Sequence, residues 1–568
     1  MASTRRLRLI LLALVAAVAV AHPRGASGEP VRARHGMVGS ADEHASRAGL
    51  RVLQRGGNAV DAAVAVGFAL AVTHPAAGNL GGGGFMVIRL ADGRETTIDY
   101  REAAPAGARR DMFLDSAGQP VADRSLIGPL ASGVPGSVAG MALAQKRYGR
   151  LPLADVMAPA IALARDGFEV SWALADSLKS AQSLLAQSLA AARAFRRADG
   201  TMPDPGDRLV QRDLAATLTL IADQGPDAFY KGAIADLIAA EMARSGGLIT
   251  KADLSAYTPR ERLPIIGSYR GHRVVSMPPP SSGGIALVQL LNILERFPLA
   301  AYGHNSSRSI HLVAEAARRV YADRSEWLGD PDFFDVPVAG LLSRRYADAL
   351  RSGISETRAT SSRDVKPGQP RTFEHSETTH FSVVDADGSA VAATTTLNGS
   401  YGNGQMVTGA GFLLNNEMDD FSAKPGTPNM FGLIGGEANA VGPGKRMLSS
   451  MTPTILVKDG KTRLVVGSPG GGRIITTVLQ VVLNVVDFKM NVQEAVDAPR
   501  FHHQWLPDVI RLERQGFPAD VVAALEAMGH TTDVGADMGE VHAIMIDEAT
   551  GLRLGASDPR QDGRTLGY

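Results

Sequence analysis

The sequence predicts an α+β protein in which antiparallel sheets are covered by helices. Three observations support this fold class. Apolar residues dominate long helical stretches, such as the Ala/Val-rich segment 60–72. Short segments with strand character occur in pairs around turn residues, as on either side of Ala91-Asp92-Gly93. These pairs are hairpins and not repeated β-α-β units, so we expect antiparallel sheets.

The expected elements can be placed in chain order. A helix begins near Glu43 and ends at Gly56-Gly57, which breaks it, and a buried helix follows over 60–72. The remaining expectations for the first 350 residues are strands at 85–89 and 95–100, helices that include 154–166 and 209–223, a strand near 274 that runs into a proline-rich loop at 278–284, and helices over 285–350.

The bulk composition is that of a large globular protein. Of the 568 residues, 45% are apolar and 20% are charged. The 58 basic and 58 acidic residues give a formal net charge of zero. Nothing in this balance indicates a nucleic acid or an anionic membrane as a partner.

The first residues have the pattern of a secretory signal. Arg5, Arg6 and Arg8 precede an apolar run at 9–21, and small residues follow. The run is too short to span a bilayer comfortably, so an uncleaved anchor is the weaker alternative. We assign residues 1–28 to the signal, with cleavage after Ala21 or near Gly28. The mature protein is then expected to be periplasmic or secreted, without a membrane segment.

The chain has no cysteine. An exported protein without disulfides is held by its core alone, which suits a large protein of a bacterial periplasm. Covalent catalysis would have to use an oxygen or nitrogen nucleophile. The thirteen histidines show no ligand spacing, and the glycine run 470–472 lacks the ending of a phosphate-binding loop. We therefore expect no metal and no cofactor.

A polar segment divides the chain before its most informative hairpin. Residues 354–377 are rich in Ser, Thr and Arg and predict a flexible linker. Strands are expected at 380–384 and 389–397, around Ala386-Asp387-Gly388. Further along, we expect strands at 463–467 and 541–547 and a helix at 473–486.

The register of this hairpin depends on its loop. A three-residue loop with Gly388 in the left-handed region pairs Asp385 with Ser389. Counting outwards sets Thr378 opposite Thr396.

In that register Asn398 lies two residues further on, on the same face as Thr396. A two-residue Asp-Gly loop would instead oppose Thr378 to Leu397 and turn Thr396 to the other face. The sequence alone leaves both registers open.

Six stretches, long and rare enough to be specific, carry a family resemblance that extends over essentially the whole mature chain. From residue 378 onward, and in two stretches upstream of it, the chain resembles the γ-glutamyltranspeptidases, the glutathione-cleaving members of the N-terminal-nucleophile hydrolases. The stretches are 79–85 (NLGGGGF), 99–102 (DYRE), 378–385 (TTHFSVVD), 413–421 (LLNNEMDDF), 443–454 (PGKRMLSSMTPT) and 467–471 (GSPGG).

The resemblance implies a four-layer αββα sandwich made as a single precursor. Cleavage between Glu377 and Thr378 would give a large subunit, 29–377, and a small subunit, 378–568. The cut frees an α-amine beside the Thr378 hydroxyl, and this amine titrates near neutrality and can serve as its base. A well-known bacterial member has Gln in place of Glu377, but the family varies at that position.

The resemblance also implies roles for the residues of the site. Thr396 would hydrogen-bond the Thr378 side chain, and the backbone N–H groups of Gly470 and Gly471 would form the oxyanion hole. Phe431 would stand in a lid where bacterial members often have tyrosine. In the substrate pocket, the carboxylate would be bound by Arg101, Ser449 and Ser450, and the ammonium by Asn398, Glu417 and Asp420.

The implied activity is the cleavage of glutathione and other γ-glutamyl compounds, with transfer of the acyl group to water, an amino acid or a dipeptide. One alternative is a cephalosporin or glutaryl acylase on the same scaffold. Another is a non-catalytic periplasmic binding protein, which would stay uncut. The intact charged residues Arg101, Glu417 and Asp420 favour the γ-glutamyl interpretation.

Overall fold

Alternating side chains along the central strands build two separate cores. In the computed structural model, which describes residues 28–370 and 381–568, Phe85 and Val87 of β3 pack into a core shared by two sheets. Met86 and Ile88 point to the other face and pack against helices. This period of two is that of a strand buried on both faces, and it places β3 in an inner layer.

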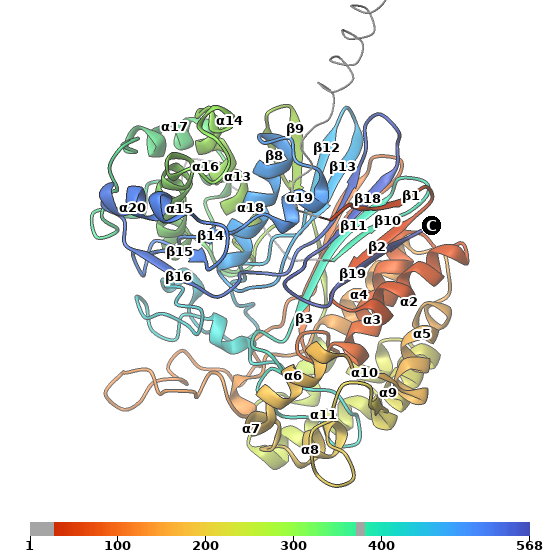
Figure 1. Ribbon diagram of the computed structural model, residues 1–568. Coiled ribbons are helices and arrows are strands. Elements are labelled where there is room, and N and C mark those ends of the chain that lie inside the picture. Colours follow the sequence, from red (N-terminus) through yellow and green to blue (C-terminus); the bar gives the residue numbers. More distant parts are fainter. Residues whose placement is uncertain (1–27, 371–380) are drawn as a thin grey trace, which may run out of the picture.

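Two seven-stranded sheets form the two inner layers, and each is antiparallel throughout (Figure 1). The first sheet has the order β19 (Arg564–Gly567), β2 (Met37–Ser40), β10 (Ser382–Val384), β11 (Ala390–Thr396), β3 (Gly83–Arg89), β4 (Glu95–Asp99), β7 (Arg260–Arg262). The second has the order β1 (Val31–Ala33), β18 (Arg553–Ser557), β17 (His542–Ile546), β13 (Lys461–Val466), β12 (Thr454–Lys458), β9 (His272–Ser276), β8 (Ile265–Tyr269).

Helices form the two outer layers (Figure 1). The first sheet is covered by α2 (Glu43–Gln54), α3 (Ala59–Thr73) and α4 (Ser137–Tyr148), with α5 (Leu153–Asp166) and α9 (Arg212–Gln224) outside them. The second sheet is covered by α13 (Gly283–Leu294), α15 (Ser307–Trp327), α18 (Arg473–Val486) and α19 (Val492–Asp497). The α+β, four-layer αββα prediction is confirmed.

The remaining elements within the described residues are further helices, three 3₁₀ turns and two small sheets. The helices are α6 (Trp172–Ser180), α7 (Gln182–Leu185), α8 (Leu189–Phe195), α10 (Asp227–Tyr230), α11 (Ala233–Ser245), α12 (Lys251–Ala256), α14 (Leu299–Tyr302), α16 (Val338–Leu341), α17 (Arg344–Ser352) and α20 (Ala519–Ala527). The 3₁₀ turns are η1 (Pro129–Ala131), η2 (Glu417–Asp420) and η3 (Glu437–Asn439), and the small sheets contain β5 (Phe168–Glu169), β6 (Arg208–Leu209), β14 (Phe501–His502), β15 (Ile510–Glu513) and β16 (Thr532–Gly535).

Helix α3 is the central support of the first sheet. All of its residues are buried, and it contacts both β10 and β11. A capping box starts it, in which the Asn58 side chain and Asp61 bond each other's backbone N–H groups. Gly56, with φ of 93°, ends the preceding helix, as the sequence predicted.

Strands from both sides of residue 378 alternate in the first sheet. β10 and β11 lie between β2 and β3, so chain segments before and after the expected cleavage site share backbone hydrogen bonds. The two parts predicted as subunits are therefore not separate folding units in this sheet.

The prediction of a flexible linker is wrong for residues 354–370. This stretch has no helix or strand, but its backbone is tied to the protein. Ser362 N donates to Asp508 Oδ2 (2.7 Å) and Gly368 N donates to Asp323 Oδ1 (2.7 Å). Polar composition indicated a flexible segment, whereas the buried Asp323 carboxylate and the partly exposed Asp508 carboxylate accept hydrogen bonds from this backbone. Within the described ranges, no helix is long and apolar enough to cross a membrane; the predicted signal lies outside them, apart from Gly28.

Candidate functional site

A cavity of about 640 Å³ opens where β11, η2 and the start of α18 meet. Its walls combine segments that are far apart in the sequence. Of the residues predicted for the site, those that line it are Thr396, Asn398, Glu417, Asp420, Phe431, Ser449, Ser450, Gly470 and Gly471. Glu377 and Thr378 lie outside the described residues.

The hairpin of β10 and β11 adopts the three-residue register. Ser382 pairs with Ala392 and Val384 with Ala390, and Gly388 has φ of 92°. The three-residue alternative is therefore confirmed for the described part of the hairpin. The prediction that Thr378 lies opposite Thr396 falls on a residue outside the described part of the chain.

The end of β11 is held by Asn79, a residue that the sequence analysis gave no role. Asn79 Nδ2 donates to Thr395 Oγ1 (3.0 Å) and to the Thr396 carbonyl (2.7 Å). Its Oδ1 accepts from Gly82 N (2.9 Å). A Cβ at Gly82 would lie 2.1 Å from the Thr396 oxygen, so only glycine permits this approach. The glycine-rich stretch 79–85 was the available signal.

Asn398 reaches the cavity by a different route from the one predicted. β11 ends at Thr396, and Asn398 has φ of 72°, so it does not continue the strand face. Its backbone N donates to Thr396 Oγ1 (2.7 Å), and its Nδ2 donates to the Asn416 carbonyl (3.0 Å). The short polar side chain of asparagine tolerates this left-handed conformation. The same-face prediction is wrong, although both residues line the cavity.

A buried cluster of charges forms one wall of the cavity. The Arg101 guanidinium, 0% exposed, donates from Nη1 to Glu417 Oε1 and from Nη2 to Asp420 Oδ2 (2.6 Å). Its Nε donates to the Met447 carbonyl (3.1 Å). The neighbouring Glu102, also fully buried, approaches Arg101 Nη1 at 3.8 Å. Three carboxyls thus surround one guanidinium.

Burial controls the protonation of these carboxyls. It raises the pKa of Glu102 to about 7, although the nearby Arg101 guanidinium lowers it. Burial likewise raises the pKa of Glu417 well above its ordinary value, and that of Asp420, in both cases against the influence of Arg101. Burial lowers the pKa of Arg101, but the three carboxyls outweigh it and raise it overall. The guanidinium therefore stays charged, and the cluster has negative charge in excess when its carboxyls ionise.

The arrangement differs from the predicted pocket with opposite charges at two ends. Glu417 and Asp420 line the cavity, whereas Arg101 does not and lies behind them. Burial explains the difference, because a charge taken out of water is costly unless it is paired. The motifs suggest a role for each charge but do not reveal that these charges pair with one another.

Two further backbone segments line the cavity. Gly470 and Gly471, with φ of 131° and 56°, precede the N-terminus of α18, and their carbonyls accept from Arg473 N and Ile474 N. A Cβ on Gly471 would lie 2.4 Å from the Phe431 ring. Phe431 therefore packs directly over this glycine, in the segment predicted as a lid. That segment is joined to the charge cluster, since Asn429 Nδ2 donates to Asp420 Oδ1 (2.9 Å).

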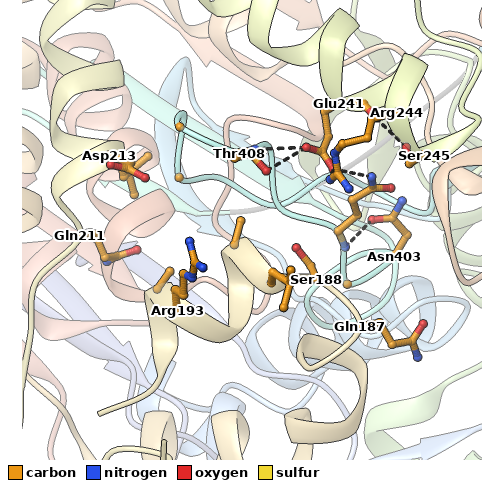
Figure 2. A pocket seen from close by; sticks show the side chains of 18 of the residues that line it. Gln187, Ser188, Arg193, Gln211, Asp213, Glu241, Arg244, Ser245, Asn403 and Thr408 are labelled. Atoms are coloured by element: carbon orange, nitrogen blue, oxygen red, sulfur yellow. Dashed lines mark hydrogen bonds and ion pairs between the residues drawn. The ribbon is translucent and has the colours of Figure 1, made fainter. Parts of the chain in front are cut away.

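A second cavity, of about 820 Å³, lies between α8, α9, α11 and the loop 403–411 (Figure 2). Its buried carboxylate, Glu241, accepts hydrogen bonds from Gln405 Nε2 (2.8 Å), Thr408 Oγ1 (2.9 Å) and Arg244. Figure 2 shows Arg193, an exposed residue of α8, among the side chains that line this cavity. The carboxylate is satisfied by its neighbours, so it ties α11 to the loop, and we assign it a structural role.

Within the described part of the chain, no group of three or more His, Asp or Glu side chains could hold a metal ion. His502 is used structurally: its Nδ1 lies 2.7 Å from Thr476 Oγ1 and its Nε2 lies 2.8 Å from Gln504 Oε1.

Known proteins match this chain over nearly its whole length. The sequence profile described as gamma-glutamyltranspeptidase matches residues 45–568. A glutathione hydrolase proenzyme of Escherichia coli (strain K12) is 56% identical over 95% of this chain and 93% of its own length. An "Acylase ACY 1 proenzyme" of Pseudomonas sp. (strain V22) is 40% identical, over 94% of each chain.

Solved structures agree with this match. A cephalosporin acylase from Bacillus halodurans superposes with a TM-score of 0.85, at 29% identity, over 97% of this chain and 98% of that chain. A γ-glutamyltranspeptidase chain from Helicobacter pylori superposes with a TM-score of 0.57, at 45% identity, over 61% of this chain and 97% of that chain. The latter chain thus corresponds to a part of the present one.

The αββα layers, with the cavity at the end of the central hairpin, define the class of N-terminal-nucleophile hydrolases. Within that class, the chain belongs to the γ-glutamyltranspeptidase family.

Proposed function

We propose that this protein is a self-cleaving γ-glutamyltransferase and glutathione hydrolase with Thr378 as its nucleophile. One observation carries the proposal. A single cavity combines Thr396, the glycines that precede α18, and the Glu417 and Asp420 carboxylates with Arg101 behind them. Family membership supports the same activity.

The reaction follows from these positions. Cleavage after Glu377 frees the α-amine of Thr378, which takes the proton as Thr378 Oγ attacks the γ-glutamyl carbonyl. The N–H groups of Gly470 and Gly471 stabilise the oxyanion, a contribution of about 3–4 kcal/mol per donor in comparable sites. The amine of cysteinylglycine leaves with a proton, and an ester to Thr378 remains. Water or an acceptor amine then attacks the ester and regenerates the free hydroxyl.

Recognition uses both charges of the γ-glutamyl group. The excess negative charge of the cluster attracts the α-ammonium to Glu417 and Asp420, with Asn398 beside them. The Ser449 and Ser450 hydroxyls donate to the α-carboxylate. When the substrate ammonium binds Glu417 and Asp420, it replaces part of their hydrogen bonding to Arg101. The Arg101 guanidinium can then donate to the substrate carboxylate.

Maturation and export complete the proposal. Residues 1–28 direct export and are removed, and the large (29–377) and small (378–568) subunits stay together in the periplasm or outside the cell. The shared first sheet supports this, because separating the subunits would break the backbone pairing of β10 with β2 and of β11 with β3.

N-terminal sequencing of the purified protein tests the maturation. We expect two fragments, one of which begins Thr378-Thr379-His380, and a single uncut chain for Thr378→Ala. A wild-type protein that stays uncut would contradict the proposal and favour the non-catalytic binding protein.

Hydrolysis of anilides tests the acyl specificity. We expect the processed wild type to prefer the γ-glutamyl anilide over the glutaryl anilide, because Glu417 and Asp420 bind the α-ammonium that glutaryl lacks. Preference for the glutaryl anilide would instead place the protein with the acylases among its relatives.

A further inference from the structure

A second arginine, Arg324, supports the serine side of the site cavity. It lies in the last turn of α15 and is 5% exposed. A cation is favoured at this position, because the carbonyl end of a helix carries partial negative charge. Neither the motifs nor the lining of the cavity include this residue, and its reach into the site depends entirely on the packing of α15.

The Arg324 guanidinium contacts two loops beside the cavity, one that contains Ser282 and one that contains Ser449 and Ser450. Its Nη2 donates to Ser450 Oγ (2.9 Å) and its Nε donates to Ser282 Oγ (2.6 Å). Ser282 links Arg324 to Ser449: its Oγ donates to the Ser449 carbonyl (2.8 Å), and its backbone N donates to the same oxygen (2.7 Å). One side chain of α15 therefore fixes both Ser449 and Ser450.

The direction of these hydrogen bonds determines what the serines can offer a ligand. A guanidinium only donates, so Ser450 Oγ must accept from Arg324. Ser449 Oγ accepts from Met451 N (3.3 Å). Each serine oxygen thus accepts a hydrogen bond from the protein, and each hydroxyl still has its own proton to donate. A carboxylate, which only accepts, fits this pair of donors.

Charge points to the same ligand. The Arg101 guanidinium is engaged by Glu417 and Asp420. Arg324 brings a second cationic group to Ser450, which lines the cavity. Burial of both Ser282 and Arg324 weakens solvent screening of this charge. The Arg324 charge is also felt at Asp420, where it lowers a pKa that burial, the largest influence, raises.

We propose that Arg324 is a positioning residue that sets the specificity of the site for an α-carboxylate, by orienting the Ser450 hydroxyl and, through Ser282, the Ser449 loop. This inference rests on the proposed function and deepens it. Arg324 acts through the serines, while Arg101 remains tied to the ammonium-binding carboxylates until the substrate arrives.

Inhibition by three small acids tests the inference. L-glutamate carries an α-carboxylate and an α-ammonium, glutarate only the α-carboxylate, and 4-aminobutanoate only the ammonium; all share the terminal carboxylate. For Arg324→Met, we expect the inhibition constants of L-glutamate and glutarate to rise about 10- to 100-fold, the range of a lost charge-assisted hydrogen bond. The constant of 4-aminobutanoate should change less than about threefold.

Three further variants keep the result interpretable. Arg324→Lys retains the charge but cannot reach both serines, so we expect an intermediate loss. Ser282→Ala leaves the guanidinium and removes only the relay, so we expect a smaller loss for the same two acids. Arg319→Met is the matched control: Arg319 is a buried arginine of the same helix that bonds Glu315 Oε2 (2.8 Å), and all three constants should stay as in the wild type.

Constants are measured on processed protein, with hydrolysis of the γ-glutamyl anilide as the readout. If Arg324→Met and Arg324→Lys raise the inhibition constants of all three acids equally, Arg324 has only a structural role and the inference is overturned. Unchanged inhibition constants would also overturn it. An inactive wild type would instead contradict the proposed function, so the two failures are distinguishable. If a variant is not processed, the dissociation constants of the three acids are measured on its precursor and on the Thr378→Ala precursor. The ratio of the two constants for each acid then replaces the ratio of inhibition constants.

Discussion

The two large cavities differ in how their buried charges are satisfied. Around the second cavity, the Glu241 carboxylate accepts from three neighbouring side chains. At the smaller site cavity, both oxygens of Glu102 and one oxygen of Glu417 have no hydrogen-bond partner within the described residues. A buried carboxyl oxygen that lacks a hydrogen bond is costly, even with a guanidinium nearby, and persists where function uses it. Unsatisfied charge, and not volume, therefore distinguishes the candidate active site.

Replacing the central cation of the site should have the largest effect. Arg101→Met leaves the surrounding carboxyls without their counter-charge, a loss of about 3–5 kcal/mol for a broken buried pair. We expect kcat/KM for the γ-glutamyl anilide to fall at least about 100-fold in any processed protein, measured by steady-state kinetics. A fall of less than threefold would show that the cluster is not used by the substrate.

Removing the satisfied carboxylate should affect stability alone. Glu241→Ala deletes the acceptor that joins α11 to the loop 403–411 and leaves the Gln405 and Thr408 donors without it. We expect the free energy of unfolding to fall by about 1–3 kcal/mol, with KM unchanged, measured by urea unfolding and by kinetics. Glu241→Gln keeps one acceptor oxygen, so its free energy of unfolding should fall less than that of Glu241→Ala. A changed KM at normal stability would make the second cavity a ligand site.

The unsatisfied carboxyl should also give a distinctive pH dependence. The pKa of Glu102 is raised from 4.5 to about 7, so between these values the folded protein binds the proton more tightly than the unfolded chain. Its contribution to stability is present at low pH and is lost as the pH rises through this window. Urea unfolding of the uncut Thr378→Ala protein should show this decline.

Glu102→Gln should flatten that decline by about 1–3 kcal/mol across the window. The raised pKa values of Glu417 and Asp420 act in the same direction, so a smaller slope should remain. An identical slope with and without the substitution would mean that Glu102 does not titrate there.

The smallest effect is expected from the exposed charge of the second cavity. Arg193→Ala removes a surface guanidinium and should change the free energy of unfolding by no more than about 0.5 kcal/mol. Both kcat and KM should match the wild type. A tenfold change in either constant would overturn the structural role assigned to that cavity.

Local features of the sequence predicted much of the fold. The capped, Ala/Val-rich α3 and the hairpin strands follow from periodicities that depend on neighbouring residues alone. The register of the hairpin was not among these features, because Gly388 fits both a two-residue and a three-residue loop; the strand pairing decides for the latter. Asn398 was misplaced because its left-handed conformation is stabilised by contacts with Asn416, which sequence spacing does not reveal.

By itself, the sequence determined the class of fold and the residue types that the site requires, since these depend on short-range geometry and on recognisable motifs. It left two registers of the central hairpin open, and the structure decided between them. Only the tertiary structure decided which charges meet. Arg101 pairs with Glu417, and Arg324 with Ser450, across 316 and 126 positions of the chain. Such pairings arise because burial penalises any charge that lacks a partner, and the available partners depend on how the layers pack.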